Sequence, residues 1–149
     1  MKNSKILSLI LVMAMLFSLA SCSLFGKDAE EDEASATEIL WQNATYTEDA
    51  TVGNGAKTIM VSVIALEKTV KITVKTDRDN LGDALIESGL AEGDNGAYGL
   101  YVKKVNGISA DYDKDKAYWG FCIDGEALPY GVSDAEISGG ESYELVYTK

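Results

Sequence analysis

Two β-strand patterns followed by a helix pattern constrain the fold of this chain more than any other feature. Residues 58–66 are β-branched and mostly apolar, which is typical of a strand covered on much of both faces. Val70, Ile72 and Val74 then alternate with polar residues, as in a strand with one buried face. A turn at residues 67–68 would join the two strands, so we expect a β-hairpin.

The helix pattern follows this hairpin directly. Asp79 or Asn80 can cap its first turn, and Gly89 stands where a helix would end. Between them, four residues have the i, i+3, i+4, i+7 spacing of one helix face: Leu81, Ala84, Leu85 and Ser88. The sequence therefore predicts a short helix packed on the hairpin.

The second half of the chain is again rich in strand patterns. Three strands are predicted: residues 98–105, 118–123 and 142–147. The first two end in Asn106-Gly107 and Asp124-Gly125, pairs that tolerate the positive φ of tight turns. On the middle strand, Trp119, Phe121 and Ile123 share one face.

These elements follow the order β-β-α-β-β-β, and residues 40–46 can add a short leading strand. Residues 111–116 form a polar loop in this scheme. One helix across a small mixed sheet is a β-grasp-like arrangement within the α+β class.

The first residues read as an export signal. Residues 1–21 combine the positive charges of Lys2 and Lys5 with an apolar run over residues 6–19. Leu-Ala-Ser directly before Cys22 resembles the bacterial lipobox, in which the cysteine is acylated and becomes the new N-terminus. We therefore expect an exported protein anchored by lipid at Cys22 to the outer face of the cell membrane. The alternative is an ordinary cleaved signal with an incidental cysteine.

The segment after Cys22 differs from the rest of the chain. Residues 22–37 are small and acidic, with four consecutive carboxylates at residues 30–33. Such a segment buries too little apolar surface to offset its ordering entropy. We expect a solvated tether there and a folded domain over residues 38–149.

The formal net charge of −11 excludes one class of partner. An acidic chain without a basic patch does not neutralise phosphates, so we expect no nucleic-acid binding. With Cys22 acylated, Cys122 has no partner for a disulfide within the chain. Because Cys122 lies in an apolar strand without a cationic neighbour, we expect an inert, buried thiol.

Motifs of catalysis and metal binding are missing. The chain contains no histidine, which removes Ser-His and Cys-His nucleophile pairs and most transition-metal sites. Asp111, Asp113 and Asp115 alternate like the start of an EF-hand loop, but Lys116 and Cys122 replace its glycine and glutamate. We therefore expect neither an enzyme nor a metal site.

The tyrosines are the most suggestive remaining feature. The chain has eight, mostly near predicted strand ends and loops. They are explained either by strand propensity and cross-strand packing, or by an amphipathic aromatic surface that stacks on a ligand or partner.

Several stretches together resemble the DUF4430 family. They are residues 75–85, 98–107 and 118–125, with Leu40-Trp41, residues 44–46, Gly131-Val132 and Tyr147. The family is similar to the C-terminal β-domain of the cobalamin carriers transcobalamin and intrinsic factor. The resemblance covers about residues 38–149 and implies a β-grasp-like sheet in an exported, often lipid-anchored protein.

The resemblance also implies a function. We expect a non-enzymatic surface module that binds a small extracellular ligand, with a corrinoid as the candidate, and delivers it to a transporter or partner. No cofactor is required. The candidate contact residues are Tyr98, Tyr101, Asn106, Tyr118 and Tyr130. The alternative is a protein–protein interaction or adhesion module without a small-molecule ligand.

Overall fold

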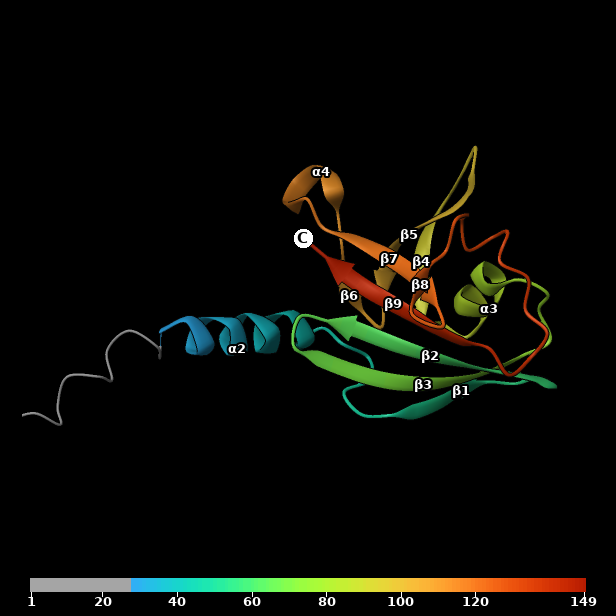
Figure 1. Cartoon of the computed structure of the whole chain (residues 1–149), viewed down its shortest axis with the longest axis horizontal. Coiled ribbons are helices and arrows are strands. Elements are labelled where there is room, and N and C mark those ends of the chain that lie inside the picture. The colour runs from blue at the N-terminus through green and yellow to red at the C-terminus, as the bar shows by residue number, and fades with distance from the viewer. Residues whose placement is uncertain (1–27) are drawn as a thin grey trace, which may run out of the picture. The chain divides into compact units, whose positions relative to one another are not determined.

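The computed structural model describes residues 28–149, so the leader and Cys22 lie outside the described residues. Six strands of the described chain form the main sheet, in the order β1-β3-β2-β9-β7-β8 (Figure 1). Their bounds are β1 Ala50–Gly53, β2 Lys57–Ala65, β3 Lys68–Thr76, β7 Tyr118–Ile123, β8 Glu126–Ala127 and β9 Ser142–Thr148.

Strand β2 organises this main sheet. It pairs antiparallel with β3 along its whole length and parallel with β9 on its other side. Strand β7 continues the sheet antiparallel to β9. The sheet is therefore mixed, and the predicted α+β, β-grasp-like class is confirmed.

A smaller sheet stands apart from the main one. It contains β4 (Ala91–Gly96), β5 (Gly99–Val105) and β6 (Ile108–Ser109), in that order. The sequence predicted β5 but placed it in a single sheet. Asn106 and Gly107, with φ of +51° and +80°, instead turn the chain back onto β5. A shift in register at Glu92 and Gly93 of β4 also bends this hairpin.

The three described helices are α2 (Asp28–Trp41), α3 (Leu81–Glu87) and α4 (Tyr112–Asp115). Helix α3 is the predicted one. The side chain of Asn80 caps it by accepting a hydrogen bond from the Asp83 amide at 2.8 Å. Gly89, with φ of +72°, follows its last turn, where a left-handed residue ends a helix well.

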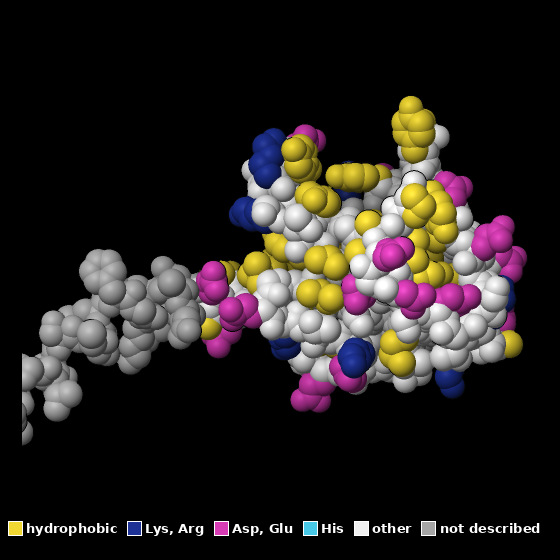
Figure 2. All heavy atoms as spheres, in the orientation of Figure 1, with side chains coloured by type: hydrophobic (Ala, Val, Ile, Leu, Met, Phe, Trp, Pro, Cys, Tyr) yellow, Lys and Arg dark blue, Asp and Glu magenta, His cyan; other side chains and the backbone are white. Residues whose placement is uncertain are grey.

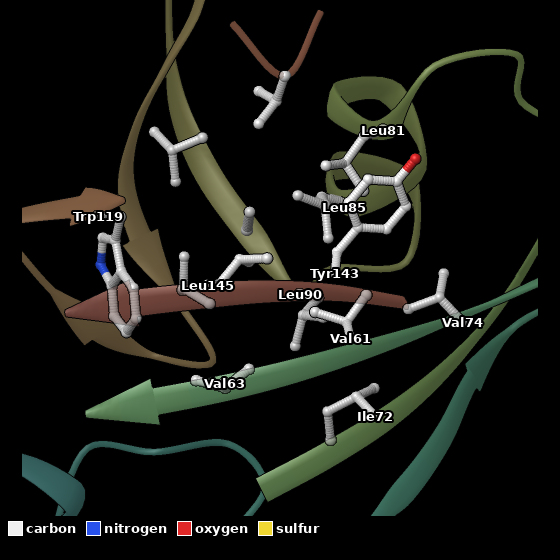
Figure 3. Close-up of a cluster of buried hydrophobic side chains, with 14 of the residues drawn as sticks. Val61, Val63, Ile72, Val74, Leu81, Leu85, Leu90, Trp119, Tyr143 and Leu145 are labelled. Atoms are coloured by element: carbon white, nitrogen blue, oxygen red, sulfur yellow. The ribbon is translucent and has the colours of Figure 1, made fainter. Parts of the chain in front are cut away.

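The core lies between one face of the main sheet and the elements above it, α3 and the smaller sheet. Figure 3 shows Val61 and Val63 of β2, Leu145 of β9 and the two leucines of α3, Leu81 and Leu85, among these buried side chains. Each such side chain contributes about 1.5–3 kcal/mol when removed from water. The alternating apolar residues of β2, β3 and β9 thus fix which face of the sheet α3 covers.

The other face of the main sheet is open, which corrects one prediction. Ile59, Val61 and Val63 of β2 are buried, but Met60 between them is 41% exposed. Residues 58–66 were expected to be covered on much of both faces. Strand β2 is half-buried instead, because no described helix packs behind it.

The beginning of the domain also differs from the prediction. Residues 40–46 were expected to form a leading strand, but α2 runs to Trp41, and the first strand is β1 at Ala50–Gly53. The indole of Trp41 is buried and donates a hydrogen bond from Nε1 to the carbonyl oxygen of Ala65 at 3.0 Å. This contact holds residue 41 at the end of the β2–β3 hairpin, away from the strand edges.

The acidic segment is helical from Asp28 onward rather than lacking structure. The side chains of residues 33–36 are nevertheless exposed, as expected for a solvated spacer. The turn between β2 and β3 lies at Leu66 and Glu67, one residue earlier than predicted, and Leu66 takes a φ of +54°.

Candidate binding site

The β4–β5 hairpin projects from the body of the domain and carries a tyrosine at its tip. Tyr98 is 96% exposed, and Figure 2 shows hydrophobic atoms at the end of this projection. Gly99, with φ of +93°, closes the turn. Ser133 supports the hairpin close to its tip, because its Oγ accepts a hydrogen bond from the Leu100 amide at 3.0 Å. Tyr98 is therefore presented on a supported hairpin.

A cleft of about 470 Å³ lies between this hairpin, β6 and α4. Its volume falls within the range of about 300–1,000 Å³ that is typical of small-molecule sites. The lining is polar and charged, and it includes Asp94 and Lys103 from the hairpin, Ser109 from β6, and Asp111 and Lys114 around α4. The cleft is open to solvent, so a larger ligand would place only one edge in it.

Ion pairs organise both walls of this cleft. Lys103 pairs with Asp94 across the hairpin, and Lys114 pairs with Asp111 at 2.9 Å. The Asp94 carboxylate raises the pKa of Lys103, with smaller contributions from Asp111 and Tyr101. The Lys114 ammonium holds the pKa of Asp111 below its usual value. The cleft therefore offers ammonium and carboxylate groups to a ligand of either charge.

The α4 wall carries an aromatic pair. Tyr112 and Tyr118 pack edge to face, with ring centroids 6.4 Å apart, and Lys116 Nζ lies 4.9 Å from the Tyr112 centroid. The carboxylate of Asp111 caps α4 by accepting hydrogen bonds from the amides of Asp113 and Lys114. The predicted polar loop at residues 111–116 is thus a single helical turn that exposes Tyr112, and Tyr118 at the start of β7 packs against it.

The aspartates of this turn do not form a metal site. Asp111 caps α4, and Asp115 accepts a hydrogen bond from the Ala117 amide at 3.1 Å. Among residues 28–149, no group of three acidic or cysteine side chains is arranged to hold a metal ion.

Four predicted contact residues lie at the surface. Tyr98, Tyr101, Tyr118 and Tyr130 are between 45% and 96% exposed. They do not form one cluster: Tyr118 packs on Tyr112 at α4, whereas Tyr98 and Tyr101 belong to the hairpin. The residue after Tyr130, Gly131, approaches the carbonyl oxygen of Tyr98, so the loop after β8 lies beside the hairpin tip.

The fifth predicted contact residue, Asn106, has a structural role instead. It is fully buried, and its side chain bonds both backbone groups of Tyr46. A ligand cannot reach this amide in the structure. The Asn-Gly pair was a correct turn signal, but the side chain faces inward because it satisfies backbone groups that would otherwise be buried without partners.

The charged residues of the cleft were not predicted. Lys103 and Lys104 are paired with Asp94 and Glu92 of β4, and β4 itself was not predicted as a strand. Its sequence, Ala-Glu-Gly-Asp-Asn-Gly, lacks β-branched and aromatic residues. The alternation of Glu92 and Asp94 opposite two lysines was the signal that could have found the pairs.

Cys122 was expected to be a buried thiol, but its side chain is half-buried on the open face of β7.

No helix within the described part of the chain has the length and apolar character needed to cross a membrane.

Comparison with known proteins gives the family of the second half of the chain. Residues 79–149 match the domain of unknown function DUF4430. This stretch runs from the start of α3 through β9 and contains the hairpin, α4 and the cleft. The predicted DUF4430 resemblance is thereby confirmed over these residues. No curated protein matches the sequence.

Two solved structures share the fold. A protein from Ruminococcus gnavus ATCC 29149, described as a candidate metal binding protein, is 28% identical with a TM-score of 0.59. The match covers 63% of this chain and 98% of that protein. Haptocorrin, crystallised in complex with Cbi, is 20% identical with a TM-score of 0.50. That match covers 62% of this chain but only 25% of haptocorrin, and at this identity it shows the fold alone.

Proposed function

We propose that this DUF4430 protein is a non-enzymatic module that binds a small ligand in the cleft between the β4–β5 hairpin and α4. The observation that carries the proposal is the open 470 Å³ cleft, which Lys103 lines from the hairpin and Lys114 lines from α4, with Tyr101 close to Lys103 on β5. Paired charges orient a polar ligand, and tyrosines supply apolar area with little loss of conformational entropy.

A corrinoid is the first ligand to test. The fold is shared with haptocorrin, whose structure contains Cbi. A corrin ring carries amide side chains that can bond both carboxylates and ammonium groups, and its flat face can stack on Tyr101, which lies close to Lys103 on β5. The size of the cleft fits contact with one edge of such a ligand. The match covers only a quarter of haptocorrin, so we expect a second protein surface to complete the enclosure.

The cellular setting forms part of the proposal. The lipobox-like sequence at Cys22 supports an exported lipoprotein that holds the domain at the outer face of the membrane, where it passes its ligand to a transporter. The absence of histidine from the sequence supports binding rather than catalysis.

Titration of the full chain with cobinamide and cobalamin tests the proposal. Binding should change the visible spectrum of the corrinoid and raise the melting temperature, since a ligand at 100 times its Kd adds about 2.7 kcal/mol. Lys103→Ala and Tyr101→Ala should each weaken binding severalfold without unfolding the domain. Lys75→Ala, on the open face of the main sheet, is the matched control. Equal binding by the cleft variants and the control would reject the cleft, and no binding of either corrinoid would reject this ligand.

A protein-interaction module is the second candidate. The nearly complete exposure of Tyr98 at the hairpin tip favours it, because a projecting tyrosine is a common anchor of protein interfaces. Tyr98→Ala should then abolish capture of the partner while leaving any corrinoid binding in the cleft unchanged.

A further inference from the structure

A second groove lies on the opposite side of the hairpin, where β4 and β5 face α3. It encloses about 340 Å³. Ile86 of α3 and Leu100 of β5 supply its apolar surface, and Gly93 and Asn95 of β4 form its wall. Ile86 is 43% exposed although it belongs to a helix whose other apolar residues are buried. Figure 1 shows β4 and α3 side by side in this region, and the two elements are in contact.

Strand β4 is the edge of its sheet. Among the described strands it pairs with β5 alone, and residues 92–96 are all exposed. Gly96 and Gly99 form the last pair before the turn, so the backbone groups of Gly96 point toward β5. Because residues alternate along an antiparallel ladder, the N–H and C=O groups of Asn95 and Gly93 point away from β5, out of the free edge of β4 that borders the groove.

This edge lacks the usual protection against strand pairing. Edge strands are commonly shielded by lysine, proline or inward-pointing charges. The carboxylates of Glu92 and Asp94 are held by Lys104 and Lys103 of the neighbouring strand, and Gly93 and Gly96 have no side chain. Only the register shift at Glu92 and Gly93 interrupts the edge, which leaves residues 93–96 accessible.

We propose that the groove between β4 and α3 binds an extended, basic peptide segment of a partner protein, which adds to β4 as a further strand. Backbone hydrogen bonds to Gly93 and Asn95 would hold the segment, and an apolar side chain would fill the space between Ile86 and Leu100. This is strand addition at a sheet edge beside a helix, a common mode of peptide recognition.

The acidic side chains that line the groove favour binding of a basic segment over pairing with a second copy of this acidic chain. Asp83 and Glu87 project from α3 into the groove, and Arg78 offsets one of these carboxylates through its ion pair with Glu87 at 3.0 Å. Lysine or arginine residues flanking the apolar anchor would complement the remaining charge. Pairing of two β4 strands would instead join two chains that each carry a net charge of −11 and place their acidic strands together.

Fluorescence anisotropy with the full chain tests this site. The probe is a labelled decapeptide of alternating valine and lysine. Ile86→Lys should weaken its binding at least tenfold by removing the apolar contact and repelling the lysines. Ile39→Lys, an isoleucine of α2 that is 61% exposed, is the matched control and should bind as the wild type does. Asn95→Pro should also weaken binding, because proline removes the outward N–H donor.

Hydrogen exchange provides the second measurement. Bound peptide should slow exchange of the Gly93 and Asn95 amides and leave the amides of β1 unchanged. A peptide with proline in place of valine keeps the charge but cannot form a strand, and it should not bind. Equal binding of the proline peptide, no binding of the valine peptide, or unchanged exchange at β4 would each overturn the proposal. None of these results bears on corrinoid binding in the cleft between the hairpin and α4.

Discussion

The side chain of Asn106 bonds both backbone groups of Tyr46, 60 residues earlier in the chain. Its Oδ1 accepts a hydrogen bond from the Tyr46 amide at 2.8 Å, and its Nδ2 donates one to the Tyr46 carbonyl oxygen at 2.8 Å. The Thr45 amide adds a bond to the Asn106 carbonyl oxygen at 2.9 Å. One buried side chain thus attaches the loop after α2 to the turn between β5 and β6.

Replacement of Asn106 should destabilise the domain. Asn106→Ala leaves two backbone groups of Tyr46 without partners and puts alanine at a φ of +51°, so we expect a loss of about 2–4 kcal/mol in the free energy of unfolding. Asn106→Gly relieves the backbone strain and should lose less. Urea denaturation of both variants checks this prediction. If Asn106→Ala were as stable as the wild type, the contact with Tyr46 would contribute nothing.

Replacing Trp119 should lower the free energy of unfolding much more than replacing Tyr118. Trp119 is 4% exposed, donates a hydrogen bond to the Ile108 carbonyl oxygen and packs edge to face on Tyr147 at 5.6 Å. Trp119→Ala should cost about 3–5 kcal/mol. Tyr118→Ala, one residue away with a 45% exposed ring, should cost about 1 kcal/mol or less. Similar losses in chemical denaturation would show that the assignment of strand faces is wrong.

Trp41 is the last residue of α2, a helix that begins in the acidic segment. We expect its side chain to stabilise the folded domain. Its indole is buried, bonds Ala65 and lies under the Lys68 ammonium, which is 4.8 Å from the ring centroid. Trp41→Phe keeps much of the apolar contact but removes the hydrogen bond, so we expect a loss of about 1 kcal/mol from that bond. Trp41→Ala should lose several times more. Thermal and urea unfolding of the two variants separate packing from hydrogen bonding.

The free energy of unfolding of the domain should decrease as the pH drops below about 4.5, the ordinary pKa of a glutamate. Burial raises the pKa of Glu141, but hydrogen bonds from the amides of Ser138 and Gly139 hold it lower overall. The Lys57 ammonium, 2.7 Å away, lowers the pKa of Asp79. Carboxyls with lowered pKa values in the folded state stabilise it above their unfolded values, and this stabilisation is lost as the pH falls through the folded values.

Glu141→Gln tests this acid dependence. The amide retains an acceptor but does not titrate, so the variant should be less stable at pH 7 and lose less stability between pH 7 and pH 3 than the wild type. Denaturation midpoints across this range measure the slope. Glu144→Gln, three residues later on β9, is the control, and an equal slope in both variants would contradict the role of Glu141.

The expected lipid anchor can be tested directly. Cys22→Ala should abolish incorporation of a fatty-acid analogue and release the protein from the membrane fraction. Cys122→Ala is the control, because the thiol of Cys122 lies within the folded domain on β7. Equal labelling of wild type and Cys22→Ala would rule out acylation at this cysteine.

Strong local patterns explain which elements could be predicted from the sequence. Strands β2 and β3 and helix α3 were predicted correctly, because apolar periodicity and the Asn80 cap act over a few residues. Strand β4 was missed because its exposed glycines and acidic residues form a strand only through pairing with β5. The separation into two sheets depends on long-range pairing, which periodicity does not report.

The candidate site was predicted in part for the same reason. Exposure of Tyr98 and Tyr118 followed from their places at strand ends, and it is observed. The ion pair between Lys103 and Asp94 required knowledge of β4 and its register. Asn106 was assigned correctly to a turn, but its burial depends on Tyr46, a residue far away in the sequence.

The parallel pairing of β2 with β9 determines the order in which the chain can fold during synthesis. Val61 and Val63 lie beside Tyr143 and Leu145, so nearly the whole domain must be made before β2 gains its second neighbour. The β2–β3 hairpin and α3 can form early because their contacts are local, whereas β7 joins the main sheet through β9. Until β9 arrives, an emerging chain leaves one edge of β2 without a partner strand, and such unpaired edges favour aggregation during folding.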